Sequence, residues 1–319
     1  MSKPASKLDS TDCGKEWAVI LAGGDGTRLK SLTRKIAGDE RPKQFCSVLG
    51  KVTLLEETRA RAALELARER TLYVVNRIHE PYYGPILRNE PVSNLVVQPS
   101  NRGTAPAILY SLLRIAAVDP HAVVAYLPSD HYVSDNEQFM AHIHAALEIA
   151  RRRTDLVTLL GLDPESPEVE YGWIEPAEPI RGQSRIYGVH RFWEKPNQLL
   201  AQLLQLRGCL WNSFVMIASV QALLGIIESA LPQLCSSFIV IAPFLGTPEE
   251  SNLIDKLYAR MEETNFSHQV LAHRPERLAV LKVTGVRWND LGEPRRVLAS
   301  LSMAGVRPHW LEACLPQFA

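Results

Sequence analysis

The chain has 319 residues, and its 35 lysines and arginines balance its 35 aspartates and glutamates. This length suits one large α/β domain, or one domain with a small appendage. The balanced charge argues against a nucleic-acid partner, and the lack of any apolar stretch near ~18 residues argues against a membrane span.

The N-terminal residues 1–15 are polar and lack the apolar core of a secretory signal, so we predict that they form a mobile leader. The five cysteines are scattered without a CxxC pair, at Cys13, Cys46, Cys209, Cys235 and Cys314. Such a set argues against zinc and against a disulfide framework, and it predicts small buried thiols. These features predict a cytoplasmic protein and leave open whether it forms a homo-oligomer.

In the first half of the chain, short apolar runs alternate with helical patterns. We predict strands at residues 18–22, 71–76, 95–98, 123–127 and 156–160, and helices at 54–70, 105–117 and 138–153. Apolar strands separated by amphipathic helices indicate an α/β fold with a Rossmann-like, doubly wound, mostly parallel sheet covered on both faces.

The second half predicts a mixed extension of the same sheet. Its strands are expected at residues 171–176, 186–193, 210–217 and 278–283, and its helices near 198–206 and 219–229. Proline breaks at 164–167 and 243–248 indicate loops rather than domain linkers. We therefore expect a single domain over residues 16–300, with its halves meeting near residue 160, and a short C-terminal tail at 301–319.

A glycine-rich turn follows the first predicted strand. Residues 23–27 read Gly-Gly-Asp-Gly-Thr, Arg28 follows at once, and Lys43 comes later within Arg-Pro-Lys-Gln-Phe. Glycines at a strand exit let main-chain N–H groups approach an anion. Arg28 can fork two phosphate oxygens, and Lys43 adds a compact charge. The pattern predicts a polyphosphate site.

Two other phosphate motifs do not match this turn. A Walker A loop ends in Gly-Lys-Ser/Thr, whereas this turn continues as Gly26-Thr27-Arg28. The dinucleotide fingerprint GxGxxG needs glycine where Leu29 stands, which disfavours a nicotinamide oxidoreductase. A tight βα turn without a ligand is the plain structural alternative.

The segments LAGGDGTRL and RPKQF resemble the nucleotide loop of sugar-1-phosphate nucleotidyltransferases, most of all the mannose-1-phosphate guanylyltransferases. Further segments resemble this family in its order: QPSNRGTAPA (98–107), LPSDH (127–131), EYGWI (170–174), FWEKP (192–196), LWNSF (210–214) and WNDLG (288–292). The resemblance implies a nucleotidyltransferase fold, with residues 16–160 as the nucleotide half and 161–300 as the sugar-binding half.

The resemblance also implies a reaction between a nucleoside triphosphate and a sugar-1-phosphate. A phosphate oxygen of the sugar-1-phosphate attacks the α-phosphorus, pyrophosphate leaves, and an NDP-sugar forms. Because the nucleophile is already an anion, no general base is required, and catalysis depends on positioning, cations and Mg²⁺. By the same resemblance, Arg28, Lys43 and Lys195 are the catalytic cations.

The nucleotide-binding residues that the resemblance implies are Leu21, Ala22, Gly23, Gly24, Gly26, Thr27, Gln98, Gly103 and Thr104. The amide of Gln98 can bond a base edge, and the glycine at 103 admits a base close to the backbone. Thr104 is alternatively the N-cap of the helix predicted at 105–117.

Two aspartates match the family's Mg²⁺ ligands. Asp130 follows the strand predicted at 123–127, at the sheet edge where open α/β sheets bind ligands, and Asp290 stands in WNDLG. Two carboxylates together with phosphate oxygens suit Mg²⁺. Each aspartate is alternatively a turn or N-cap residue. His131 is assigned no metal role.

Gly172, Glu194 and Asn212 match the family's sugar-binding positions, although Glu194 and Lys195 are alternatively a surface ion pair. Glu170 and Phe214 stand where that family usually has glycine.

The chain departs from the guanylyl pattern in three further places: Asn-Arg-Gly at 101–103 replaces Gly-Arg-Asn, residues 265–268 lack the aspartate of Ser-Ile-Asp-Tyr, and the loop between 32 and 41 is longer than usual. We expect GTP and mannose-1-phosphate as substrates. The alternatives are UTP or dTTP, glucose or heptose phosphate, and a catalytically silent regulator that binds sugar nucleotides.

Overall fold

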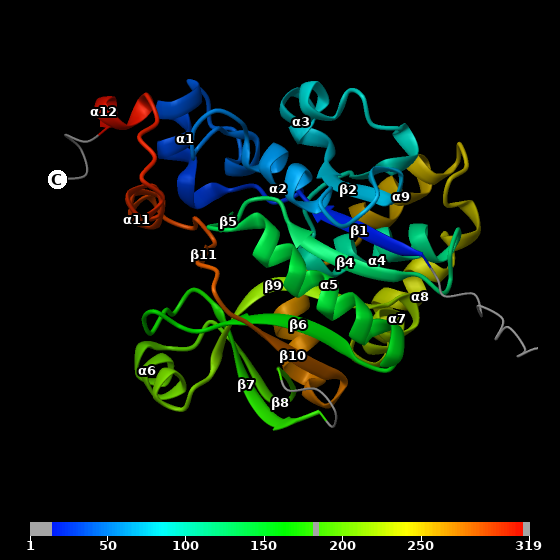
Figure 1. Cartoon of the computed structure of the whole chain (residues 1–319). Helices are drawn as coiled ribbons and strands as arrows, with labels where there is room; N and C mark the ends of the chain where they lie inside the picture. Colours follow the sequence, from blue (N-terminus) through cyan, green and yellow to red (C-terminus); the bar gives the residue numbers. More distant parts are fainter. Residues whose placement is uncertain (1–14, 181–184, 315–319) are drawn as a thin grey trace, which may run out of the picture.

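The computed structural model describes residues 15–180 and 185–314, so the predicted leader lies outside the described residues apart from Lys15. Across these residues nine strands form one sheet in the order β3-β2-β1-β4-β9-β6-β10-β8-β7 (Figure 1). The strands are β1 (Glu16–Leu21), β2 (Thr71–Asn76), β3 (Leu95–Gln98), β4 (Val123–Pro128), β6 (Val157–Leu162), β7 (Gly172–Pro179), β8 (Ile186–Glu194), β9 (Leu210–Ser219) and β10 (Leu278–Val283).

The strand pairing changes from parallel to antiparallel at β4. The strands β3, β2, β1 and β4 are parallel to one another, and so are β6 and β10. The remaining pairs are antiparallel, because β9 runs against β4 and β6, and β8 runs against β7 and β10. The sheet is therefore mixed, as predicted for its second half, but it is not mostly parallel, because β7, β8 and β9 run antiparallel to their neighbours. An apolar run carries the same signal whichever way the strand points, so the sequence pattern does not encode strand direction.

Helices cover both faces of the sheet. One face carries α2 (Leu54–Ala62), α3 (Glu80–Leu87), α5 (Asn136–Arg152) and α6 (Gln198–Leu206). The other face carries α4 (Thr104–Ala116), α7 (Val220–Ala230), α8 (Pro232–Ile239), α9 (Glu250–Ala259) and α10 (Phe266–Gln269). Strand side chains alternate between faces, so Ala18 and Ile20 enter the first core while Val19 enters the second.

Four predicted helices lie within two residues of their expected bounds, as α4, α5, α6 and α7. The helix predicted at 54–70 instead ends at Ala62, and a 3-10 turn at Arg68–Arg70 leads into β2. The loop expected between 32 and 41 is largely helical, as α1 (Lys30–Ala37). The pattern also missed α3, whose internal Pro85 disfavours a helix. Among the described residues no single helix is long and apolar enough to cross a membrane; α7 and α8 meet that test only together, across a 118° bend.

A short two-stranded ribbon stands beside the main sheet. It consists of β5 (Tyr132–Val133) and β11 (Trp288–Asn289), which pair antiparallel, with Tyr132 opposite Asn289. Asp130 precedes β5 and Asp290 directly follows β11. The ribbon therefore brings together two chain segments that lie 160 residues apart in sequence (290 − 130).

The C-terminal part of the chain packs against the segment that follows the glycine turn. The predicted tail boundary at residue 300 falls inside α11 (Pro294–Ala304), and α12 (Trp310–Cys314) follows. Trp310 is 3% exposed and joins a third cluster that includes Leu29, Leu32 and Leu54. Figure 1 shows α11 and α12 beside α1, and Leu301 and Trp310 help to bury Leu29 and Leu32, which follow the glycine turn.

Trp310→Ala tests this packing. Truncating a buried tryptophan removes apolar contacts and leaves a cavity, so we expect urea denaturation to give a free energy of unfolding lower by about 3–5 kcal/mol. Leu206→Ala is the control, because Leu206 is 85% exposed and should change the free energy of unfolding by less than about 0.5 kcal/mol. Equal stabilities for Trp310→Ala and the wild type would show that this segment does not support the fold.

Candidate active site

The sheet order reverses between β1 and β4. Both β2 and β3 lie on one side of β1, and β4 lies on the other, where Leu21 is paired with Pro128. Open α/β sheets bind ligands at such a point, beyond the carboxyl ends of the strands. The glycine turn leaves β1 at this edge, and Asp130 follows β4 at the same edge. The fold therefore places two of the predicted motifs side by side.

The segment 42–45 packs directly against the glycine turn. Gln44 is buried, and its side-chain amide donates to the main-chain oxygens of Ala22 at 3.1 Å and Gly24 at 2.7 Å. Gly26 has a φ of +59°, and a Cβ there would lie 3.0 Å from the main-chain nitrogen of Lys43. Only glycine meets both the left-handed backbone and this close approach without strain. The turn is therefore held in shape by the segment that carries Lys43.

The Lys43 ammonium joins three segments of the chain. The side chain is 8% exposed, and Nζ lies 3.2 Å from Asp130 Oδ2. Nζ also donates to the main-chain oxygens of Asp290 and, at 3.3 Å, Leu291. Leu291 has a φ of 50°, and its N–H donates to the side chain of Asn289, a turn that directs these carbonyls toward the ammonium. A buried ammonium needs such partners, because an unpaired charge in the interior is costly.

The Asp290 carboxylate is 13% exposed and strongly hydrogen-bonded. Its Oδ1 accepts from the Gly292 N–H at 2.8 Å, Arg296 Nη1 at 2.8 Å and the Tyr171 hydroxyl at 3.2 Å. Burial alone would raise the pKa of Asp290, but the Lys43 and Arg296 cations outweigh it and hold that pKa below its usual value. The side chain is therefore an anion at neutral pH.

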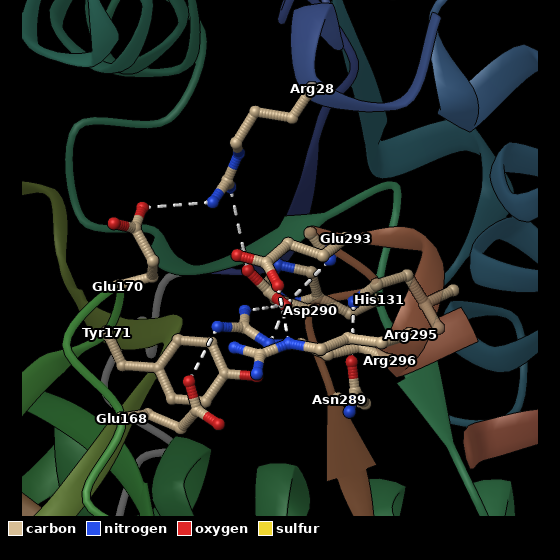
Figure 2. Close-up of polar contacts among 12 residues, drawn as sticks. Arg28, His131, Glu168, Glu170, Tyr171, Asn289, Asp290, Glu293, Arg295 and Arg296 are labelled. Carbon is tan, nitrogen blue, oxygen red and sulfur yellow. Dashed lines mark hydrogen bonds and ion pairs between the residues drawn. The ribbon is translucent and has the colours of Figure 1, made fainter. Parts of the chain in front are cut away.

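Glu170 links two predicted catalytic cations. Its Oε2 lies 3.1 Å from Arg28 Nη1 and 3.6 Å from Lys195 Nζ (Figure 2 shows the first contact). The other nitrogen of the Arg28 fork lies 3.7 Å from Asp290 Oδ2. Lys195 has a φ of 47°, a left-handed conformation that is uncommon for a residue with a side chain. Arg28 and Lys195 are each about half exposed, so both can reach an incoming anion.

Arg296 was not anticipated from the sequence. It is 5% exposed and forks between two carboxylates, with Nη1 2.8 Å from Asp290 Oδ1 and Nη2 2.7 Å from Glu168 Oε2. Its guanidinium also lies over the Tyr171 ring, 4.6 Å from the ring centre. Figure 2 shows this fork beneath Arg28 and beside Tyr171.

His131 is neutral in this arrangement. Burial lowers its pKa to about 4, although the adjacent Asp130 opposes the shift. Its Nδ1 lies 3.3 Å from the Trp288 indole nitrogen, which can only donate, so the ring proton belongs on Nε2. That nitrogen lies 3.5 Å from Asp130 Oδ1. His131 therefore lies beside Asp130 without adding a charge.

The predicted base-binding residues lie beside the glycine turn. Gln98 is buried, its Nε2 lies 2.6 Å from where a Cβ on Gly23 would stand, and its Oε1 accepts from the Tyr258 hydroxyl at 3.3 Å. The Asn101 amide donates to Asp25 Oδ2 at 2.8 Å, which ties the turn to the segment 98–104.

Gly103 and Thr104 pack against the segment 264–266. A Cβ on Gly103 would lie 2.4 Å from the Thr264 oxygen, so a side chain would force this packing apart. The Thr104 hydroxyl accepts from the Phe266 N–H at 2.8 Å, and Gly103 rather than Thr104 is the N-cap of α4. The capping role considered for Thr104 is therefore wrong, and its hydroxyl holds the neighbouring segment instead.

The three predicted sugar-binding residues adjoin one another at the ends of β7, β8 and β9. A Cβ on Gly172 would lie 3.2 Å from Glu194 Oε2 and 3.3 Å from the Asn212 Cβ. Burial raises the pKa of Glu194, with partial compensation from the lysine that follows it. Asn212 is buried, and its Oδ1 accepts from the Phe214 N–H at 3.1 Å, where Phe214 has a φ of 59°. A left-handed turn, which glycine would make without strain, is thus made here by phenylalanine.

In the described part of the chain, no three side chains of His, Cys, Asp or Glu gather into a complete metal site. Asp130 and Asp290 instead contact the same Lys43 ammonium, the first through its carboxylate and the second through its main-chain oxygen. A Mg²⁺ ion takes one or two carboxylates and completes its shell with waters and substrate phosphates. The two aspartates fit that partial donor set.

Sequence reasoning missed the residues that support this site: Gln44, Glu168, Tyr171 and Arg296. Gln44 and Tyr171 stand inside motifs that matched the family, so a polar side chain next to a matched residue was the available signal. Glu168 and Arg296 lie outside any motif, and only the fold brings them together.

The family model for nucleotidyl transferases matches residues 17–301 of this chain. A mannose-1-phosphate guanylyltransferase from Escherichia coli is 29% identical over an aligned length of 285 residues, and the match covers 86% of this chain and 59% of that protein. One from Salmonella muenchen is 30% identical over 282 residues, covering 86% of this chain and 57% of that protein. The chain thus spans less than three fifths of the length of these relatives.

A solved structure of a mannose-1-phosphate geranyltransferase from Thermus thermophilus is similar to this chain, with a TM-score of 0.76 and 30% identity. The match covers 89% of this chain and 79% of that one. Sequence and structure therefore agree, and the chain belongs to the nucleotidyl transferase family.

Proposed function

We propose that this protein transfers a nucleotidyl group from a nucleoside triphosphate to a sugar-1-phosphate, forming an NDP-sugar and pyrophosphate. The observation that carries the proposal is the clustering of Arg28, Lys43 and Lys195 with a glycine turn at the carboxyl ends of β1 and β4. Cations and exposed main-chain N–H groups at this edge are what a polyphosphate requires.

In this proposal each cation binds a different phosphate group. The glycine turn and Arg28 bind the triphosphate, Lys43 faces its α-phosphate, and Lys195 binds the phosphate of the sugar-1-phosphate. An oxygen of that phosphate attacks the α-phosphorus, and the bond from this phosphorus to the oxygen of the leaving pyrophosphate breaks. The nucleophile carries its own charge, so the protein contributes positioning and charge stabilisation rather than a base.

Asp130 and Asp290 would hold Mg²⁺ in this reaction. Bound there, the ion would neutralise phosphate charge as it develops. Asp290 Oδ1 is occupied by hydrogen bonds, whereas Oδ2 faces the side of the site where Arg28 lies. Asp130 is 28% exposed and its Oδ2 lies 3.2 Å from the Lys43 ammonium. The two aspartates thus offer oxygens to one region from two different chain segments.

GTP and mannose-1-phosphate are the substrates that we propose. The Escherichia coli and Salmonella muenchen relatives are named mannose-1-phosphate guanylyltransferases. The buried Gln98 amide beside Gly23 can read a base edge, and Gly172, Glu194 and Asn212 can hold a sugar. A catalytically silent regulator is disfavoured, because each predicted cation and each predicted metal carboxylate is present at the site.

A panel of four nucleoside triphosphates against mannose-, glucose- and heptose-1-phosphates tests this function through pyrophosphate release. We expect GTP with mannose-1-phosphate to give the highest kcat/KM, by about tenfold or more over other bases, because an unpaired buried polar edge costs ~1–3 kcal/mol. Higher kcat/KM with UTP or dTTP would refute the base assignment, and no release with any pair would refute the reaction.

Arg28→Ala and Lys43→Met test whether these two cations bind and stabilise the substrate phosphates. Each removes a cation from the transferring groups, so we expect kcat/KM to fall by about 10²-fold or more in steady-state assays. Arg34→Ala is the matched control, since Arg34 is 64% exposed on α1 and pairs with Glu40 outside the site. Thermal denaturation verifies that each variant is folded. Wild-type kinetics in both site variants would remove the basis for the assignment.

A further inference from the structure

Resting on the function proposed above, we propose that Arg296 is a positioning residue that fixes which oxygen of Asp290 is free to bind the metal ion. Arg296 lies at the start of α11, and its side chain is 6% exposed, so it does not itself face the substrates. Its guanidinium instead faces two carboxylates, those of Asp290 and Glu168.

An aspartate carboxylate needs such a partner to have one orientation. The terminal torsion of aspartate is broad, so its hydrogen bonds decide where each oxygen points. Three donors meet on Asp290 Oδ1: the Gly292 N–H, the Tyr171 hydroxyl and Arg296 Nη1. These hydrogen bonds occupy Oδ1. The other oxygen, Oδ2, points toward Arg28 and lies 3.7 Å from its Nη2. Without Arg296 the carboxylate could rotate.

Glu168 reduces how strongly the charge of Arg296 opposes a bound cation. The second arm of the guanidinium lies 2.7 Å from Glu168 Oε2. Glu168 thus offsets part of the Arg296 charge, so that Arg296 contributes a fixed geometry to Asp290 as well as charge. Lysine could not replace Arg296 here, because a single ammonium nitrogen cannot reproduce the two separate guanidinium nitrogens that contact Asp290 and Glu168.

The Glu168–Arg296 pair also connects Asp290 to the segment that precedes β7, where the proposed sugar-binding residue Gly172 lies. Glu168 lies just before β7, and its main-chain oxygen accepts from the buried Trp173 indole at 2.8 Å. The residues between them include Glu170 and Tyr171, which contact Arg28 and Asp290. Arg296 therefore ties the segment that precedes the sugar-binding strand to the segment that carries Asp290.

Arg296→Met tests this role, and Arg295→Met is its matched control. Arg295 is the neighbouring residue on α11, is 72% exposed and pairs with Glu293. Mn²⁺ serves as a paramagnetic substitute for Mg²⁺, and free Mn²⁺ is measured by EPR during titration with a non-hydrolysable GTP analogue present. Removing a group that orients a metal ligand typically weakens metal binding 10–100-fold, so we expect a Mn²⁺ Kd at least about tenfold higher for Arg296→Met and unchanged for Arg295→Met.

Two further readouts separate positioning from support of the fold. The Kd of the GTP analogue without metal should stay within about twofold of the wild-type value, while the Mg²⁺ concentration for half-maximal activity rises by about as much as the Mn²⁺ Kd. A lower Tm with wild-type Mn²⁺ affinity in the folded protein would show that Arg296 supports the fold alone, and it would overturn the proposal.

Glu168→Gln provides a second test of the proposal if Arg296→Met does not fold. This change keeps a hydrogen-bond acceptor for Arg296 but leaves its charge unneutralised beside Asp290, so we expect Mn²⁺ binding to be weaker by about threefold or more. Wild-type Mn²⁺ affinity in Glu168→Gln would overturn the proposal. Failure of the proposed function is distinct, because it would appear as absent product formation by the wild-type enzyme itself.

Discussion

The ion pair between Lys43 and Asp130 is the contact on which the candidate site depends. Burying an ammonium is costly unless partners surround it, and Lys43 draws its partners from the ends of β4 and β11. The neighbouring Gln44 holds the glycine turn by two main-chain oxygens. The segment 42–45 thus contacts the glycine turn on one side and both aspartates on the other, and this is why motifs far apart in sequence form one site.

The site pairs its own cations with its own carboxylates. Arg28 and Lys195, which we assign to different substrates, both contact the same oxygen of Glu170. A carboxylate oxygen and a phosphate oxygen offer similar acceptors to a cation, so Glu170 lies where substrate phosphates would have to enter. These side chains are a third to a half exposed, so each pair is weak and can be exchanged for a phosphate with more charge. The buried pairs of Lys43 and Arg296 provide the fixed framework.

The sequence predicted the individual strands and the local motifs well, because both depend on short-range patterns. Apolar runs located every strand of the main sheet, and the glycine turn with Arg28 indicated a phosphate site. The second half was predicted to be mixed, but the direction of an individual strand such as β9 was not predictable, since a buried strand has the same pattern either way. The Glu168–Arg296 pair was not predictable either, because it joins positions 128 residues apart that belong to no motif (296 − 168). Likewise, nothing local indicated that Trp310 packs beside Leu29.

We propose that Glu170 holds Arg28 and Lys195 until substrate phosphates replace it. The most direct measurement is the KM for each substrate in Glu170→Gly, which removes the carboxylate that contacts both cations. Each exposed ion pair is worth ~0.2–1 kcal/mol, so we predict that the KM for the triphosphate and the KM for the sugar-1-phosphate both fall, by about two- to fivefold. If either KM rises while the other is unchanged, Glu170 contributes to substrate binding, and the claim that substrate phosphates replace it is contradicted.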